Sequence, residues 1–285
     1  MRKTICLLLI ILVSVMFSQP ALAEKSADPK DYPWKTGYLN LGGYAAFLDS
    51  AFRIGESNLG IGIDLNAEEF LGLDTDDSAF RIDAGYRFGK TRRHKVEFGW
   101  FRFDREGSKY IDEQVEIPPE LGGGTIGPGS FHSLFNFDIY KLKYEYSFVF
   151  DDRVDLNVGL GVFIMPIEFG LGVYTGGVGE GSMHESITAP LPVIGLGFDF
   201  AITPKWIISQ QLELFYLEIG DFKGAITSIS VALEYLPWKH VGFGLGVDGM
   251  QVRVEAMGSD YPGIDFRGDL KFTYFGAQLY LKFYF

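Results

Sequence analysis

The fold is decided by the stretch FGAQLYLKFYF at residues 275–285. Every second residue from Phe275 to Phe285 is apolar, and the residues between them include Gln278 and Lys282. Successive side chains of a β-strand point to opposite faces, so this spacing gives one continuous apolar face and one mixed, polar face. A helix would scatter the same residues around its axis. The stretch therefore predicts an amphipathic strand.

The same alternation recurs along the chain, and its recurrence predicts an all-β fold. It is found at residues 80–88, 140–148, 154–164, 194–202, 227–235 and 241–247. A soluble sandwich or a lipocalin-like barrel also alternates, with its apolar face inward. Here the opposite face is mainly glycine, serine and single charges, and aromatic residues stand near the ends of the apolar face. An apolar band flanked by aromatic girdles is typical of a transmembrane barrel. We therefore expect a single antiparallel transmembrane β-barrel with its apolar face toward lipid.

The links between these stretches set the number of strands. Short links are expected at 89–94, 150–153, 203–205 and 237–240, and longer ones at 107–130, 176–185 and 258–263, with a further short one near Gly220-Asp221. In membrane barrels the short turns are periplasmic and the long loops extracellular. This arrangement accounts for nine strands from residue 78 onward, and closure requires one more within 37–66. Two segments compete for it, Gly37–Phe47 and Leu59–Asn66, so about ten strands are expected, with eight or twelve left open.

The N-terminus reads as a secretory signal over residues 1–23. Arg2 and Lys3 precede an apolar run, and Ala21-Leu22-Ala23 fits a cleavage site. We expect residues 24–36 to form an N-terminal periplasmic segment and residues 37–285 to form the barrel. Cys6 is the only cysteine and lies inside the signal, so a disulfide framework is excluded from the rest of the chain.

The charge balance is acidic. The sequence has 25 Lys and Arg against 37 Asp and Glu. Removing Arg2 and Lys3 with the signal leaves 23 against 37, a net charge of −14. This balance argues against nucleic acid as a partner. It also argues against a basic patch for membrane surfaces.

The C-terminal strand carries a resemblance to a known class. Residues 279–285 resemble the C-terminal signature of bacterial outer-membrane barrels, which ends in an aromatic residue and is read by the barrel-assembly machinery. The resemblance implies that the assembly signal lies at four positions, Leu279, Leu281, Phe283 and Phe285.

Several internal stretches are similar to a family of uncharacterised proteobacterial outer-membrane proteins. They are found at 63–66, 71–74, 80–83, 94–98, 189–192, 203–206 and 233–240. The resemblance implies an outer-membrane barrel in contact with lipid and lipopolysaccharide. It supplies no catalytic motif.

A search for chemistry gives weak candidates only. His94 and His240 fall in or beside short turns, where a solvated role is expected. His132 lies between Ser130 and Ser133, and His184 precedes Glu185 and Ser186, so an acyl hydrolase acting on lipid A is one hypothesis; it needs these groups within hydrogen-bond reach.

Two loop motifs give still weaker evidence for a metal or phosphate site. The acidic run at 74–77 lacks the spacing of a calcium loop, and the glycine-rich stretch at 122–127 lacks the ending of a phosphate loop. No metal or cofactor is therefore predicted.

The inward faces of the predicted strands carry charges of both signs. The polar lumen candidates are Arg81, Asp83, Arg87, Glu97, Lys141, Lys143, Glu145, Asp155, Asp199, Glu213, Glu234 and Asp248, with Lys282 beside them. An open aqueous pore is typical of barrels with about 16 strands or more, so a packed lumen is favoured here. The expected role is structural or binding, carried by extracellular loops. A narrow channel for small solutes and the hydrolase remain alternatives.

Overall fold

The computed structural model describes residues 34–54, 63–66, 68, 72–111, 115–117, 124–126, 129–175, 178–220, 222–261 and 264–285. Every one of them lies in the compact unit that spans Pro33–Phe285. The strands are β1 Gly37–Ile54, β2 Ile63–Asn66, β3 Asp76–Phe88, β4 His94–Ile111, β5 Val115–Ile117, β6 Gly124–Ile126, β7 Gly129–Phe150, β8 Val154–Thr175, β9 Val178–Thr203, β10 Trp206–Ile219, β11 Phe222–Tyr235, β12 Val241–Tyr261 and β13 Ile264–Tyr284. Within these residues no helix is long and apolar enough to cross a membrane. The predicted signal at 1–23 lies outside the described residues.

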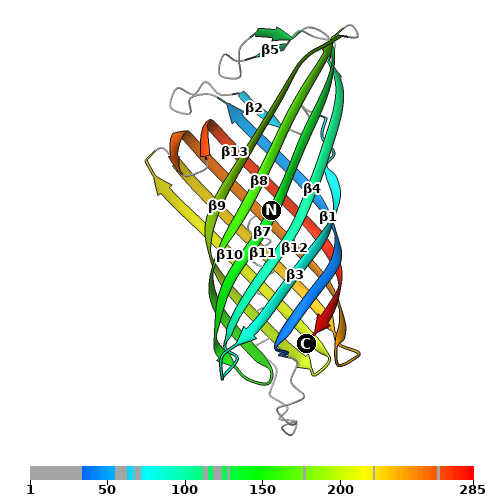
Figure 1. Cartoon of the computed structure of the whole chain (residues 1–285), viewed down its shortest axis with the longest axis vertical. Coiled ribbons are helices and arrows are strands. Elements are labelled where there is room, and N and C mark those ends of the chain that lie inside the picture. Colours follow the sequence, from blue (N-terminus) through cyan, green and yellow to red (C-terminus); the bar gives the residue numbers. More distant parts are fainter. Residues whose placement is uncertain are drawn as a thin grey trace, which may run out of the picture. The chain divides into compact units, whose positions relative to one another are not determined.

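Ten strands close into an antiparallel barrel (Figure 1). Neighbours around the barrel are β1, β3, β4 and then β7 to β13 in sequence order. β13 returns to pair with β1 over seventeen residue pairs, with Leu281 opposite Leu41. This closure leaves no free edge along the lower barrel, as lipid requires. The predicted all-β barrel of about ten strands is confirmed.

The competition within residues 37–66 is resolved in favour of the first segment. β1 pairs with β13 from Tyr38 to Ile54 on one side and with β3 over Gly37–Phe47 on the other. β2 pairs only with the upper end of β1, from Ala51 to Ile54. It is the arm of a hairpin beside the barrel, so the parity of the barrel is preserved.

The short turns have the local chemistry that tight turns need. Gly89 adopts φ +83° and Arg92 φ +53° in the β3–β4 turn. Asp151 Oδ1 accepts hydrogen bonds from the backbone N–H groups of Arg153 and Val154, both at 2.8 Å. Thr203 Oγ1 accepts from two backbone N–H groups in the β9–β10 turn in the same manner. These side chains replace backbone partners and fix the turns. We call this the short-turn end and the opposite one the loop end.

The long links were predicted too long. β8 continues to Thr175 and β9 begins at Val178, so residues 178–185 are strand and not loop. β12 likewise continues to Tyr261. The apolar alternation fades in these segments while the backbone pairing continues. A strand that leaves lipid for water no longer needs an outward apolar face. The alternating pattern therefore indicates where contact with lipid ends, and the strand itself continues further.

One side of the barrel is taller than the rest. β9 pairs with β10 only as far as Ile194 opposite Leu214. β3 pairs with β4 only as far as Arg81 opposite Phe101. Above these points β4, β7, β8 and β9 continue as a four-stranded sheet, which we call the tall sheet (Figure 1). A membrane-spanning strand needs about 9–11 residues. β7 and β8 have 22 each, so about half of their length is free for other uses.

The two faces of the barrel exchange character along its axis. On the lower part of β7, Leu142, Tyr144 and Tyr146 are outward and exposed, while Lys141 and Lys143 are inward and buried. On the upper part of the same strand, Phe135, Phe137 and Ile139 are inward and buried. Of the outward positions there, Leu134 is apolar and the others, among them His132 and Asp138, are polar. The lower half therefore has the faces of a membrane barrel and the upper half those of a soluble β-protein.

Candidate functional site

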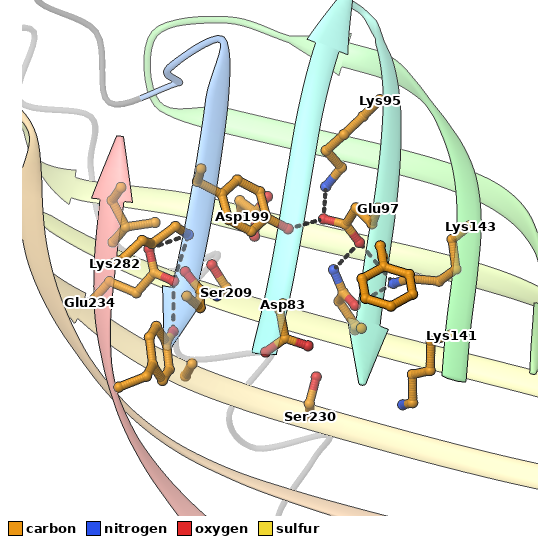
Figure 2. Close-up of a pocket in the computed structure, with 18 of the residues that line it drawn as sticks. Asp83, Lys95, Glu97, Lys141, Lys143, Asp199, Ser209, Ser230, Glu234 and Lys282 are labelled. Atoms are coloured by element: carbon orange, nitrogen blue, oxygen red, sulfur yellow. Dashed lines mark hydrogen bonds and ion pairs between the residues drawn. The ribbon is translucent and has the colours of Figure 1, made fainter. Parts of the chain in front are cut away.

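A cavity of about 130 Å³ occupies the lumen near the short-turn end, enough for several water molecules. We call it the charged chamber. Figure 2 shows side chains from several strands pointing into it. Among its lining residues are Arg81, Asp83, Arg87, Lys95, Glu97, Lys141, Lys143, Asp199, Glu213, Glu234 and Lys282.

Three lysines and three glutamates form a balanced network at its centre. Lys143 Nζ lies 2.8 Å from Glu97, 3.1 Å from Glu145 and 3.0 Å from Glu213. Lys95 Nζ bridges Glu97 and Glu145 at 2.9 and 2.7 Å. Lys141 Nζ reaches the other oxygen of Glu213 at 3.2 Å. All six side chains are at most 8% exposed. Each buried charge therefore has an opposite charge in contact, which buried ions require.

Glycines make room for this network. A Cβ on Gly161 would lie 2.7 Å from Cγ of Lys143 and 2.8 Å from the carbonyl oxygen of Leu142. A Cβ on Gly159 would lie 2.7 Å from Cγ of Glu145. Both glycines sit on β8, directly across from those residues of β7. The side chains of Lys143 and Glu145 can therefore lie flat against β8, because the two glycines have no side chains to block them.

Further ion pairs surround the central network. Arg81 Nη1 spans the lumen to Asp248 at 2.7 Å, and its Nε contacts Asp83 at 2.9 Å. Arg87 pairs with the fully buried Asp155 near the short-turn end.

A carboxylate on the other side of the chamber is held in a different way. Glu234 accepts from Lys282 Nζ at 2.8 Å and from the hydroxyls of Tyr280 and Tyr284 at 2.6 and 3.2 Å. Hydrogen bonds to a charged acceptor are the strong ones, so this group fixes β11 against β13.

An aromatic and aliphatic core fills the lumen above the chamber. Phe137 and Phe272 meet across it with ring centroids 4.4 Å apart, and Tyr44, Phe103 and Tyr274 lie in mutual contact beside them. We call this the aromatic core; it extends over most of the upper strands and includes 22 buried residues. The guanidinium of Arg81 lies 5.1 Å from the ring centroid of Phe101, at the junction of the two regions. The chamber is thus closed on the loop side by packed hydrocarbon.

A buried arginine fastens the upper end of the aromatic core. Arg105 is 1% exposed and donates to the carbonyl oxygen of Asp74, to Ser50 Oγ and to Glu68. Glu68 in turn accepts from the backbone N–H of Ser50 at 3.0 Å. Leu73, between these contacts, is buried in the core. The segment that leads into β3 is therefore held down over the top of the lumen.

The short-turn mouth is narrowed by the first described residues. Trp34 Nε1 donates to the carbonyl oxygen of Asp151 at 2.6 Å, which joins the entry to β1 with the β7–β8 turn. Trp34 and Tyr38 pack against a small cluster of Ile207, Leu236 and Tyr284. Trp34 and Lys35 also line the chamber. The predicted N-terminal segment 24–36 thus contributes side chains to the lumen at its C-terminal end, and its extent stays a prediction.

The structure places all twelve predicted lumen residues in the barrel interior. Eleven of them take part in ion pairs. Asp199 lines the chamber instead, opposite Asp155 in the strand register.

Sequence reasoning missed Lys95, Arg105 and the whole aromatic core. The core had a usable signal, since Phe101 and Phe103 alternate with the charged pair Arg102 and Asp104, the reverse of the pattern below.

The predicted C-terminal assembly residues lie on the outer face of the barrel and not in the lumen. Leu279, Leu281 and Phe285 are 64%, 41% and 67% exposed on the outer face. Phe283 lies opposite Leu39 in the pairing that closes the barrel. Their role as an assembly signal stays a prediction.

The histidine candidates are not brought together by the strand register. His132 on β7 is exposed, and the backbone of His184 and Ser186 lies on β9, with β8 between them. Two strand spacings separate such positions by about 10 Å. The side chains of His184, Glu185 and Ser186 lie outside the described residues. The register therefore gives the hydrolase hypothesis no support.

The acidic run at 74–77 serves local structure. The carbonyl oxygen of Asp74 accepts from Arg105, and Asp77 accepts from the backbone N–H groups of Ser78 and Asp104. Among the residues that the structure describes, no group of three or more His, Cys, Asp or Glu side chains is placed to hold a metal ion. In the glycine-rich stretch, residues 124–126 form β6, which pairs with β5.

Comparison with known proteins supports the fold. No family model and no curated protein matches the chain. The outer-membrane protease OmpT of Escherichia coli is similar in structure at 10% identity, with 87% of this chain and 97% of that chain covered and a TM-score of 0.53. OprG of Pseudomonas aeruginosa (13% identity, coverage 88% and 97%) and the toluene transporter TodX of Pseudomonas putida (10%, coverage 94% and 93%) have TM-scores of 0.34.

At 10% identity the likeness to OmpT is one of fold alone. It confirms the predicted resemblance to bacterial outer-membrane barrels, and the outward apolar band places the chain in that membrane. The narrower resemblance to the uncharacterised family stays a prediction.

Proposed function

We propose that this outer-membrane barrel is non-conducting and that it carries the tall sheet outside the cell as a binding surface. The observation that carries the first part is the aromatic core, which fills the lumen between the charged chamber and the loop end. A water-filled path needs polar lining and space along its whole length. Phe101, Phe103 and Ile139 are fully buried in that core and leave none at their level.

The charged chamber supports the same proposal from below. Its central lysines and glutamates neutralise one another at contact distance instead of presenting one sign of charge to a passing ion. A selectivity filter uses rings of one sign. We assign this network to holding β4, β7 and β10 together within the membrane, with no catalytic role.

The tall sheet supports the binding part. It rises beyond the height that lipid contact requires, and on β4 the outward residues Asp104 and Glu106 are exposed and Arg102 is partly exposed. An extended, paired sheet above the membrane with exposed polar side chains on β4 suits recognition of an external molecule. Loops and edges on a rigid scaffold commonly carry such roles.

Planar bilayer recordings test the closed lumen. Purified protein, with folding verified by heat-dependent gel migration, is expected to give no steady conductance at moderate voltage. A stable, reproducible conductance of the unmodified protein would contradict the proposal.

A gated narrow channel is the second candidate, favoured by the chamber and its mouth at Trp34. The variant Trp34→Ala separates the two. If the aromatic core closes the lumen, this variant stays silent, because only the short-turn mouth is widened. If Trp34 is the gate of a channel, the variant conducts and the unmodified protein does not.

A further inference from the structure

The short-turn end carries an excess of basic residues. The four turns at 89–93, 151–153, 204–205 and 236–240 contain six Lys or Arg and two Asp or Glu. The whole sequence has the opposite balance, 25 against 37. The basic residues are Lys90, Arg92, Arg93, Arg153, Lys205 and Lys239. Each of the four turns contributes at least one, so the positive charge is spread around the rim.

Five of the six basic side chains are exposed, and one of the two acidic ones is used locally. Arg93 is the exception among the basic residues, since its guanidinium donates to the carbonyl oxygens of Ser147 and Phe148. The carboxylate of Asp151 accepts the two backbone N–H groups of its own turn. Of the two acidic residues in these turns, only Asp152 has a carboxylate that does not accept backbone hydrogen bonds of its own turn. The rim has a clear net positive charge.

Aromatic residues stand directly beside this rim on the outer face. Trp206 and Trp238 are 40% and 62% exposed and are the chain neighbours of Lys205 and Lys239. Tyr146, 40% exposed, lies opposite His94 where β4 leaves its turn. Tryptophan and tyrosine mark the level of the lipid headgroups. The basic side chains are thus placed at the headgroups of the leaflet that faces the short turns.

We propose that this basic rim binds the anionic headgroups of phospholipids in the periplasmic leaflet of the outer membrane. Juxtamembrane Lys and Arg residues are attracted to anionic lipid surfaces, and the attraction is screened by salt. The spread of the charge over all four turns fits a ring of lipids around the barrel. The net acidic composition predicted no such patch, because a chain-wide sum hides a local excess of the opposite sign.

The test compares the lipids held by two forms of the protein in mixed vesicles of phosphatidylethanolamine and phosphatidylglycerol. Spin-labelled lipids of each kind report the fraction immobilised at the protein surface. The unmodified protein is expected to prefer phosphatidylglycerol. In a variant with Lys90, Arg92, Arg153, Lys205 and Lys239 all changed to Gln, that preference is expected to fall, by up to about five-fold for each charge removed.

A matched control neutralises basic residues away from the rim. Lys223, Arg253 and Lys271 lie on the upper parts of β11, β12 and β13, and their change to Gln is expected to leave the preference unchanged. Heat-dependent gel migration verifies that each variant folds. Equal binding of both lipids by the unmodified protein would overturn the proposal. A preference for phosphatidylglycerol that persists in the five-residue variant would also overturn it. This holds even if that variant loses binding to an acidic periplasmic polymer instead.

Discussion

The lower and upper halves of the barrel solve the same packing problem in opposite ways. Along β12, the outward residues below Gly249 are Phe243, Leu245 and Val247, and the inward ones are glycines and Asp248. Above Gly249 the inward residues are Met250, Val252 and Val254. The outward ones there are Gln251, Arg253 and Glu255. One strand therefore changes its apolar side without changing its pairing partners.

The difference shows that the solvent outside decides what the lumen contains. Where lipid surrounds the barrel, the hydrophobic side chains are outward, and the interior is left to ion pairs. Where water surrounds it, the hydrophobic effect directs them inward, as in any soluble β-protein. In the proposed closed barrel, the aromatic core that closes the lumen is a consequence of strands that continue beyond the lipid.

The largest expected effect comes from breaking the charge balance of the lower half. Lys143→Met leaves Glu97, Glu145 and Glu213 without the ammonium that all three contact. We expect the free energy of unfolding to fall by about 5 kcal/mol, since breaking a buried ion pair leaves uncompensated charge. Denaturant titration in lipid vesicles measures it.

A surface pair provides the control for that prediction. Lys223 lies 3.6 Å from Glu218, and both side chains are half exposed. Lys223→Met is expected to cost less than about 1 kcal/mol. Equal losses for the two variants would show that the chamber network does not stabilise the barrel.

In the upper half the corresponding loss is a cavity. Phe137→Ala removes a ring packed against Phe103 and Phe272 and is expected to cost about 4 kcal/mol. Phe275→Ala, on the outer face and 56% exposed, leaves a space that lipid fills and is expected to cost less. The same denaturant titration checks both variants. A larger loss for Phe275→Ala than for Phe137→Ala would mean that the upper lumen does not hold a packed hydrophobic core.

The level at which lipid gives way to water is sharpened by two arginine substitutions on one face of β12. Leu245→Arg puts a charge into the apolar band, and we expect a loss of about 3 kcal/mol in unfolding free energy. Gln251→Arg, three outward positions higher, is expected to change stability by less than about 1 kcal/mol near the interface. If both cost the same, the boundary drawn near Gly249 is wrong.

The smallest effect concerns the glycines of the chamber. Gly161→Ala forces the side chain of Lys143 off β8 and is expected to cost about 2 kcal/mol through overpacking. Gly43 lies on the outer face, and no atom lies within 4 Å of the Cβ position there. Gly43→Ala should therefore leave the unfolding midpoint unchanged or raise it slightly. A similar loss at both positions would point to backbone effects and not to the network.

The barrel was predictable from sequence because lipid imposes a strict period of two on the lower strands. The lumen charges were predictable for the same reason, since Lys141 and Lys143 fall between Tyr140, Leu142 and Tyr144. Their partners were not, because Glu213 lies 70 residues from Lys143 and only the barrel register brings them together. The aromatic core was not predicted because a strand surrounded by water has its apolar residues inward, the reverse of the apolar-outward alternation in the lower strands.

The central claim is that the apolar side changes from outer face to lumen partway up the barrel, and thiol labelling tests it most directly. Cys6 is the only cysteine of the sequence, so Val96→Cys, Glu106→Cys and Ala46→Cys each introduce a single thiol into residues 24–285. With a water-soluble maleimide and protein in vesicles, we predict rapid reaction at position 106, protection by lipid at position 96 and protection by the aromatic core at position 46. Reaction at position 46 as fast as at position 106, or ready reaction at position 96, would contradict the account.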